Sequence, residues 1–450
     1  MIEDPAAALD SVREWLEANV GRVVRIVPQP RWRPVWFADV EQGDTLLELV
    51  VRGDRTDMPL IFPLDHEMRL QALMHEYGAR TAKVYGFIDD PLAYVMDRVP
   101  GQNDFTGCTD EQRGKVVDDY LQILAHMHSL DIGPFVERGI MRAPTPEQSG
   151  TFGLSRYEAV YRSTKEMPDP FMEFCLGWLR RNPPDSKGRE APIVWDSGQF
   201  HHDGNRVLAV LDVEIGHIGD PMMDLAAWRM RDTIIGYGKF SELYDRYSEL
   251  TGEPVDIDAI MRHHFAFTLT NQLAMGATLR RAMPNSDLMT NMQLCYETNL
   301  FASEALAEIL QIELPTVEMP EPRTSRGTVG LAQLVGELRN IQNLVDDEFV
   351  RYKLRTMFRL ARHVTRADEI GDALSDADLD DLHELLGHRP ESWLEGEAEL
   401  ERFVLADADE GRHDEALLRL FHKRNLRNHM LLGPAGSAMA THHRIQTFSD

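Results

Sequence analysis

The chain has 450 residues, of which 43% are hydrophobic and 27% are charged, so it can bury a core and is not disordered throughout. Lysine and arginine number 47 against 74 aspartates and glutamates, which gives a formal net charge of −27. This charge argues against binding to nucleic acid or to an acidic membrane surface, because both require clustered basic side chains. It is compatible with a nucleotide site, which needs only a few local donors.

The cysteines and the N-terminus indicate the compartment. Cys108, Cys175 and Cys295 are widely spaced and form no CxxC pair, so the sequence predicts neither a disulfide framework nor a zinc site. The first residues are acidic and lack the basic-then-apolar order of a signal peptide. No uncharged apolar run reaches the roughly 18 residues of a transmembrane helix. We therefore expect a cytoplasmic protein.

The first hundred residues are rich in strand-like segments. Amphipathic helices are expected over 6–20 and 64–77, where apolar residues recur at helical spacing. Segments rich in β-branched and aromatic residues, typical of strands, are found at 23–27, 35–40, 46–52, 84–88 and 92–96. The order strand, strand, strand, helix, strand, strand predicts an N-terminal lobe over residues 1–96, built from a sheet and a helix.

From residue 110 onward the pattern is mostly helical. Helices are expected over 111–130, 154–182 (two helices), 221–231, 240–252, 257–282 and 287–312. Residues 193–212 interrupt this pattern, because two short strand-like runs there flank Asp203-Gly204-Asn205, a hairpin turn signal. The sequence thus predicts a mainly helical lobe over 97–312 that contains one β-hairpin.

A linker and a helical module are expected at the end of the chain. Residues 313–328 hold three prolines and little apolar content, which is typical of a linker. Residues 329–450 are again helical, with a broad apolar face over 329–346. We expect a separate helical module that docks on the larger lobe or mediates homodimerisation, and that carries no catalytic residue.

Four aspartates between residues 193 and 224 are the candidates for chemistry. Asp220 precedes a proline and a helix, so a helix-capping role is favoured for it. Asp196 follows a strand and Asp212 closes the second strand of the hairpin. A carboxylate at a strand end suits a metal ion or an incoming hydroxyl group, although such residues also cap turns. For Asp196 and Asp212 together, the interpretation as a site is favoured over the cap.

The sequence around these residues resembles the aminoglycoside phosphotransferase and choline-kinase-like family. Residues 212–214 (DVE) and 219–226 (GDPMMDLA) match the family's D-x-E and G-D-P-x-x-D-L-A motifs. Residues 94–101 (YVMDRVPG) look like its lobe-connecting hinge, and residues 124–128 (LAHMH) look like its L-x-x-L-H helix end. The resemblance covers about residues 20–310. It implies an α+β, two-lobed protein-kinase-like fold, to which the C-terminal helical module is an addition.

The resemblance also implies roles for individual residues. Asp196 would be the general base that accepts the proton of the substrate hydroxyl, and the hairpin over 193–214 would be the catalytic hairpin. Asp212 would hold Mg²⁺, with Gln199 in the place of the family's metal-binding asparagine. Phosphoryl transfer needs this arrangement because it depends on positioning and on charge neutralisation.

The nucleotide-binding residues implied by the resemblance lie in the N-terminal lobe. Arg52 stands where the family has a strand lysine, and Glu67 stands where the family has the glutamate that pairs with that lysine. An arginine can pair with both a carboxylate and a phosphate but is bulkier than lysine. Met96 lies at the start of the hinge and is expected to line the ATP site.

Besides Gln199 and Arg52, the sequence departs from the family pattern at three further places. Val194-Trp195 replaces the His-Gly before the catalytic aspartate, and the loop after Asp196 is two residues shorter than the pattern. The first turn, residues 28–34, lacks the usual glycines. Its arginines, Arg31 and Arg33, either substitute as phosphate donors or are solvated loop charges, and the solvated interpretation is slightly favoured.

The leading hypothesis is an ATP- and Mg²⁺-dependent O-phosphotransferase that acts on a hydroxyl group of a small molecule. The net charge favours cationic acceptors such as aminosugars, whereas residues 219–226 look most like family members associated with acyl-CoA dehydrogenases, which act on hydroxyacyl-CoA. The alternative hypothesis is a catalytically inactive kinase-like binding or scaffold protein. The departures at Val194, Gln199 and the first turn favour the alternative.

Overall fold

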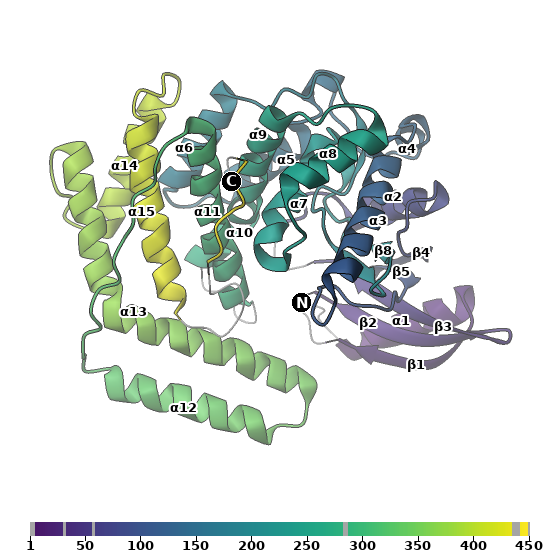
Figure 1. Ribbon diagram of the computed structural model, residues 1–450. Coiled ribbons are helices and arrows are strands. Elements are labelled where there is room, and N and C mark those ends of the chain that lie inside the picture. The colour runs from purple at the N-terminus through teal and green to yellow at the C-terminus, as the bar shows by residue number, and fades with distance from the viewer. Residues whose placement is uncertain (1–4, 30–32, 56–58, 282–286, 434–441, 449–450) are drawn as a thin grey trace. The chain divides into compact units, whose positions relative to one another are not determined.

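The computed structural model describes residues 5–29, 33–55, 59–281, 287–433 and 442–448. The contacts of the chain divide it into two compact units, which are described separately. Unit 1 comprises residues 1–156, 185–263 and 446–450, and unit 2 comprises residues 157–184 and 264–445 (Figure 1). Among the described residues, no helix is long and apolar enough to cross a membrane.

Unit 1 begins with a helix and an antiparallel sheet of five strands in the order β1-β2-β3-β5-β4 (Figure 1). The elements in chain order are α1 (Pro5–Asn19), β1 (Arg22–Pro28), β2 (Val35–Gln42), β3 (Thr45–Gly53), α2 (Leu64–Glu76), β4 (Val84–Asp89) and β5 (Leu92–Asp97). This is the predicted order of three strands, a helix and two strands. The prediction of an α+β fold with a small antiparallel sheet before a mainly helical region is confirmed.

The sheet folds because one of its faces is apolar. Trp36, Ala38 and Val40 alternate along β2, so all three point to the same face, where they are buried. The helix α1 packs Val12 and Leu16 into the same core cluster. This core fixes the position of β3, and Arg52 is the second-last residue of that strand.

The rest of unit 1 is helical apart from short strands. The main helices are α3 (Asp110–His128), α4 (Gly133–Glu137), α7 (Met222–Ile235) and α8 (Phe240–Thr251). The short strands are β6 (Ala191–Ile193), β7 (Phe200–His202), β8 (Val207–Val210) and β9 (His217–Gly219). The strands β7 and β8 pair in antiparallel register, so the hairpin predicted around Asp203-Gly204-Asn205 is present.

The elements that the structure describes in unit 2 are all helices. Two helices, α5 (Phe152–Thr164) and α9 (Ile257–Thr268), begin in unit 1 and end in unit 2. The others are α6 (Pro170–Arg181), α10 (Thr270–Arg280), α11 (Leu288–Leu310), α12 (Thr328–Leu344), α13 (Glu348–Leu386), α14 (Trp393–Asp407) and α15 (Asp414–Leu432). Residues 312–327 form no helix or strand.

The two units do not divide at that linker. The helix α15 packs on α11, and α14 packs on α6. The ring of Phe421 on α15 lies 5.3 Å from Phe171 and 5.4 Å from Phe174 on α6, measured between ring centroids. The helical module expected over 329–450 therefore shares its core with helices expected to belong to the preceding lobe. The domain boundaries at residues 96 and 312 stay predictions.

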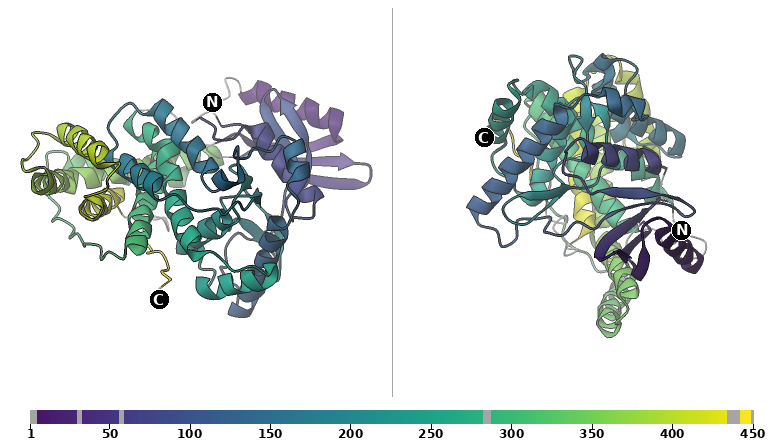
Figure 2. Two further views of the ribbon diagram at one scale, coloured as in Figure 1. Left: turned by 90° about the horizontal axis from the view of Figure 1, so that it is seen from above. Right: turned by 90° about the vertical axis from the view of Figure 1, so that its right-hand side faces the viewer.

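The helices α12 and α13 form a hairpin within unit 2 (Figures 1 and 2). Leu338 is the buried residue of α12, whereas Val329 and Leu344 are each 81% exposed. The second half of α13 is better packed, with Ile370, Leu374, Leu379 and Leu382 buried. The broad apolar face predicted over 329–346 is thus only partly covered, by α13.

Candidate active site

The loop after β6 presents Asp196 in a constrained backbone conformation. Trp195, directly before it, has a φ of 58°, which is unfavourable for a residue with a side chain. The carboxylate of Asp224, on α7, accepts hydrogen bonds from the backbone N–H of Trp195 (2.6 Å) and of Val194 (3.3 Å). These two bonds hold the turn at the position where the family has His-Gly.

Asp224 is itself held by a buried histidine. His128, at the end of α3, places its Nε2 3.0 Å from Asp224 Oδ2, and its Nδ1 lies 2.7 Å from the hydroxyl of Tyr247. Asp224 and His128 are almost completely buried. The orientation of the Asp196 loop is therefore set by a hydrogen-bonded chain that runs through three helices, α3, α7 and α8.

The structure brings Asp196, Gln199 and Asp212 together. The side-chain amide of Gln199 donates to Asp196 Oδ2 at 2.8 Å and lies 3.4 Å from Asp212 Oδ2. The two aspartates are separated by sixteen residues of chain, and the β7–β8 hairpin returns the chain so that they meet. Their side chains are 24% and 31% exposed, so a ligand can reach both.

Asp212 also meets the residues predicted in the N-terminal lobe. Arg52 Nη2 donates to Asp212 Oδ1 at 2.8 Å, and Arg52 Nε lies 2.7 Å from Glu67 Oε1. Glu67 is buried and accepts a further hydrogen bond, of 2.9 Å, from the hydroxyl of Tyr94. The arginine is thus fixed from both sides, which positions it as the family's lysine would be positioned.

Arg33 is a correction to the sequence analysis. The favoured interpretation was a solvated loop charge, but Arg33 is only 3% exposed. Its Nε donates to the carbonyl of Gly53 at 2.9 Å, and its Nη1 donates to Glu214 Oε2 at 2.8 Å. Glu214 accepts from Arg52 as well, at 3.0 Å. The other loop arginine, Arg31, lies outside the described residues.

The acidic groups of the site differ in their pKa values. Burial raises the pKa of Asp196, while the nearby Arg231 guanidinium opposes this shift. Burial also acts to raise the pKa of Asp212, but Arg52 and Arg33 outweigh it, and the pKa of Asp212 is lowered. Asp212 is therefore ionised at neutral pH, as a metal ligand must be.

Arg231 is a site residue that the sequence analysis missed. Its Nη2 forms an ion pair with Asp196 Oδ1, the carboxylate oxygen that Gln199 does not contact. Arg231 follows Asp224 by seven residues on α7, which places both side chains on the same face of that helix. This spacing is a signal that could have suggested that both residues face the catalytic loop.

Met96 lies on β5 just before the hinge. It pairs with Val50 on β3 and Val84 on β4, and its sulfur accepts a hydrogen bond of 3.3 Å from Gln71. Past the end of β5 a shallow pocket of about 380 Å³ opens. It is lined by Leu46, Leu47, Glu48, Asp97, Arg98, Val99, Pro100 and Leu208.

The residues around Asp212 fit a magnesium ion by their chemistry. Mg²⁺ prefers oxygen ligands and is bound in nucleotide sites by one or two protein side chains together with phosphate oxygens. Asp212 would supply a carboxylate, and the Gln199 amide, whose nitrogen faces both aspartates here, would supply an oxygen if it turned. Burial and the charge of Asp212 raise the pKa of Glu214 to about 7, which indicates an excess of negative charge beside the two arginines. A divalent cation would neutralise that excess.

Solved structures similar to this chain include antibiotic phosphotransferases. A macrolide 2'-phosphotransferase from Brachybacterium faecium has a TM-score of 0.42 and 16% identity, and the match covers 58% of this chain and 90% of that chain. Aminoglycoside phosphotransferase APH(4)-Ia, in a ternary complex with ADP and hygromycin B, has a TM-score of 0.43 and 16% identity over 64% of this chain and 97% of that chain.

The curated proteins that are similar to this chain are named as acyl-CoA dehydrogenases. Acyl-CoA dehydrogenase family member 11 of Rattus norvegicus is 29% identical over 206 residues, which are 43% of this chain and 26% of the relative. The probable acyl-CoA dehydrogenase IBR3 of Arabidopsis thaliana is 25% identical over 213 residues, again 43% of this chain and 26% of the relative. The chain thus spans about a quarter of the length of the curated relatives it matches.

The family comparison agrees with the geometry of the site. Residues 33–249 match the model described as the phosphotransferase enzyme family. This segment includes Arg52, Glu67, Asp196, Gln199 and Asp212. The resemblance found in the sequence is confirmed, and the enzyme class it implied, a phosphotransferase, is that of the matching family. Residues 33–249, a little under half of this chain, are thus similar to the phosphotransferase enzyme family.

Proposed function

We propose that the chain is an ATP- and Mg²⁺-dependent phosphotransferase that acts on a hydroxyl group of a small molecule. The observation that carries the proposal is the convergence of Asp196 and Asp212 on Gln199, with Arg52 held on Asp212 by Glu67. This convergence supplies a base, an oxygen donor set for a cation and a fixed guanidinium in one place. Those are the groups that positioning and charge neutralisation in phosphoryl transfer require.

In this proposal the nucleotide phosphates lie over Arg52. Arg33 donates to Glu214, and Arg52 donates to both Glu214 and Asp212, so one buried and one partly buried guanidinium group stand beside the proposed metal ligand. They replace the glycines that the first turn lacks, because side-chain donors can bind phosphate where backbone N–H groups are absent. The pocket beyond Met96 and the hinge is the proposed place of the base.

Asp196 is the proposed general base, and it must release a partner before it acts. Oδ1 is engaged by Arg231 and Oδ2 by the amide of Gln199. If the Gln199 amide turns to present its oxygen to Mg²⁺, it withdraws its N–H groups from Oδ2. Oδ2 then becomes free to accept the hydroxyl proton of the substrate. Metal binding and activation of the base would be linked through Gln199.

The proposed acceptor is a hydroxyacyl-CoA-like molecule. The support is the set of relatives, since acyl-CoA dehydrogenase family members of two mammals and probable acyl-CoA dehydrogenase IBR3 of a plant each match 41–43% of this chain. An aminosugar-like molecule is the second acceptor class that we propose, because the net charge of −27 favours cationic substrates. A direct comparison of the two acceptor classes in a phosphate-transfer assay separates them.

A catalytically inactive, nucleotide-free binding protein is the second candidate. One specific observation favours it: both oxygens of Asp196 are occupied by side chains of the protein itself. A carboxylate paired with arginine is a weak base, and the family's His-Gly is replaced by Val194-Trp195. In this candidate Arg231 and Gln199 would be permanent structural partners of Asp196.

Calorimetric titration with Mg²⁺-ATP tests the proposal. We expect binding that requires Mg²⁺, and we expect Asp212→Asn to lose most of it. A ligand at 100 times its Kd stabilises the fold by about 2.7 kcal/mol, so a thermal shift gives a second readout. ADP formation that depends on a hydroxyacyl-CoA or an aminosugar then identifies the acceptor. A folded protein that binds no nucleotide at millimolar concentration would refute the enzyme and leave the second candidate.

A further inference from the structure

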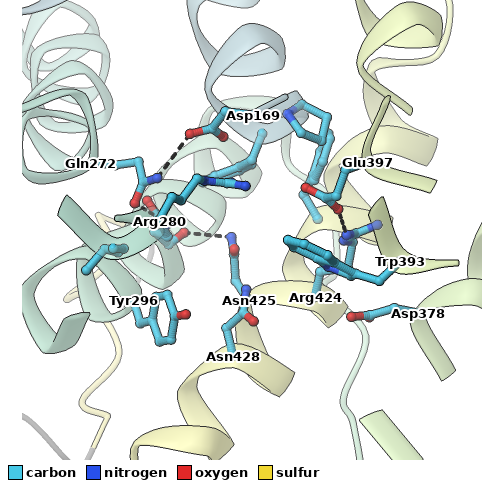
Figure 3. A pocket seen from close by; sticks show the side chains of 15 residues that line it. Asp169, Gln272, Arg280, Tyr296, Asp378, Trp393, Glu397, Arg424, Asn425 and Asn428 are labelled. Carbon is cyan, nitrogen blue, oxygen red and sulfur yellow. Dashed lines mark hydrogen bonds and ion pairs between the residues drawn. The ribbon is translucent and has the colours of Figure 1, made fainter. Parts of the chain in front are cut away.

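Unit 2 contains a polar cavity of about 200 Å³ that the proposed function does not use (Figure 3). It is open to solvent on one side and is lined by residues of α6, α10, α11, α13, α14 and α15. Apart from residues 169–171, all of its lining residues lie beyond residue 249, where the match to the phosphotransferase family ends. The cavity is therefore a feature of this chain that the family does not account for.

Two buried polar atoms of the cavity wall lack a partner in the described part of the chain. They are Oδ1 of Asn299 and Nη1 of Arg424. The two residues are only 7% and 8% exposed, so bulk water does not reach them freely. A buried polar group without a hydrogen bond costs about 1–3 kcal/mol. One acceptor and one charged donor are thus left for a bound molecule.

A second cation faces the same cavity. Figure 3 shows Arg280 extending from α10 toward the middle of the cavity, opposite the ion pair of Arg424 and Glu397. No hydrogen bond or ion pair joins Arg280 to any residue that the structure describes. Its charge nevertheless acts on Glu397: burial raises the pKa of that carboxyl, and Arg424 and Arg280 oppose the rise. Arg280 and the free Nη1 of Arg424 together can bind a carboxylate.

The negative charges of the cavity wall are also not fully balanced by positive ones. Three carboxylates line the cavity, Asp169, Asp378 and Glu397, against two arginines. Asp169 accepts from Gln272 at 3.0 Å, and Asp378 accepts from Arg427 at 2.6 Å. Burial still raises the pKa of Asp378 and of Glu397. An ammonium group beside Glu397 would relieve this excess. The unpartnered Oδ1 of Asn299, which lines the same cavity, is a further acceptor for its N–H groups.

The remaining wall is apolar and the space is small. Trp393, Leu279, Phe171 and Phe421 contribute apolar surface. Drug-sized ligands occupy about 300–1,000 Å³, so this cavity suits a smaller molecule. A ligand of one charge would satisfy only half of the wall. We propose that the cavity binds a small zwitterion of the α-amino acid type, with its carboxylate at Arg280 and Arg424, its ammonium at Glu397 and Asn299, and its side chain beside Trp393.

The test uses probes that differ by one group. L-alanine, L-norleucine and L-phenylalanine represent the class, and hexanoate and n-pentylamine are norleucine without its ammonium and without its carboxylate. We expect calorimetric binding of at least one amino acid, and binding of hexanoate and pentylamine that is weaker by about tenfold or more. Equal binding of either single-charge analogue overturns the zwitterion, and binding of none of the three amino acids overturns the site.

Variants locate the binding. Arg280→Met removes a side chain without a partner, so it should leave the fold intact and weaken amino-acid binding about tenfold or more. Arg402→Met, at an exposed position of α14, is the matched control and should change nothing. Glu397→Gln should weaken binding as well, and circular dichroism shows whether it still folds. Unchanged binding in Arg280→Met places the ligand elsewhere and overturns the proposal.

The proposal is independent of the proposed enzyme. Asp196→Ala should bind the amino acid as the unchanged protein does, with or without Mg²⁺-ATP. Loss of amino-acid binding in Asp196→Ala would assign the ligand to the phosphotransferase site and overturn the separate cavity. Failure of ATP binding, by contrast, would leave the amino-acid result unaffected.

Discussion

Arg231 on α7 forms an ion pair with Asp196, the proposed general base, through Oδ1 of the carboxylate. Both side chains are less than a quarter exposed, so the pair is partly shielded from solvent. The aspartate carries a negative charge that burial disfavours, and Arg231 supplies the compensation. The pair therefore has a structural role whether or not the base is active.

Removing this cation should destabilise the fold. We expect Arg231→Met to lower the free energy of unfolding by about 1–3 kcal/mol, because it leaves Asp196 without its counter-charge. The double variant Asp196→Asn with Arg231→Met should lose less than the sum of the single losses. Denaturant unfolding measures all three. Additive losses would mean that the two residues do not interact in solution.

The role of Asp196 can be separated from nucleotide binding. Asp196→Asn should reduce turnover by about 10²–10⁴-fold, the range for loss of a general base, while the Kd for Mg²⁺-ATP changes little. Asp44→Asn, in the exposed turn between β2 and β3, is the control and should alter neither. Parallel loss of turnover and ATP affinity would identify Asp196 as a metal ligand or a structural residue.

The contacts of Arg52 predict how it tolerates replacement. Its guanidinium reaches Glu67 with Nε and Asp212 with Nη2, which a lysine ammonium cannot do with the same geometry. Arg52→Lys and Glu67→Gln should each weaken ATP binding by about tenfold, and the double variant should lose less than the product. Calorimetry provides the affinities. A lysine that binds ATP better than the arginine would contradict this account.

Two buried histidines predict a loss of stability in acid. His66 and His217 both stack on the ring of Phe62, with centroid distances of 5.0 and 5.3 Å. Burial lowers the pKa of His66 to about 3 and that of His217 to about 4. Below the ordinary value of 6.5 the unfolded chain binds more protons than the folded chain.

The stability that comes from keeping these histidines neutral should therefore be fully present above about pH 6.5. As the pH drops toward 4, the free energy of unfolding should fall by about 1.4 kcal/mol per pH unit for each histidine. Denaturant unfolding at several pH values gives the slope. His66→Phe should reduce it, and His388→Gln, at an exposed position, should not. A slope that His66→Phe leaves unchanged would show that His66 does not remain neutral.

The shared core of unit 2 changes what a truncation should do. The sequence analysis predicted that residues 329–450 fold separately, so a chain ending near residue 318 would stay folded. In the structure such a cut removes Phe421 from Phe171 and Phe174 and exposes the apolar face of α6. We expect the shortened chain to aggregate or to lose helical signal in unit 2. A monodisperse product with native-like circular dichroism would support the separate module.

The sheet and the hairpin could be predicted because their signals are local. Each signal is contained in a few neighbouring residues: the alternation of a strand, the turn at Asp203-Gly204-Asn205 and the motif around Asp212. Asp196, Asp212, Arg52 and Glu67 could be named because the family motif fixes them. The structure adds the distances: Asp196 and Asp212 meet at Gln199, and Arg52 joins Asp212 to Glu67.

Arg33 and Arg231 were missed because their environments are made by distant segments. An arginine between prolines in a turn is usually solvated, and the burial of Arg33 depends on Glu214, 181 residues away. Arg231 is one of many charged residues on helices, and its partner lies 35 residues earlier on another element. Likewise the apolar faces beyond residue 329 were recognised, but a periodic pattern does not reveal which helix covers them.

The sparse packing of α12 has a consequence for how the molecule opens. With Leu338 as its buried residue, α12 gains little from tertiary contacts, and isolated helices of its length are marginal in water. Its unfolding exposes almost no additional core, so it can proceed without the rest of unit 2. Amide protons of residues 328–344 should exchange with solvent long before those of α11 and α15. The chain then unfolds at two different free energies, a low one for α12 and a higher one for the rest of unit 2. A protease that cuts the locally unfolded α12 leaves Asp196 and Asp212 of unit 1 in an intact polypeptide segment.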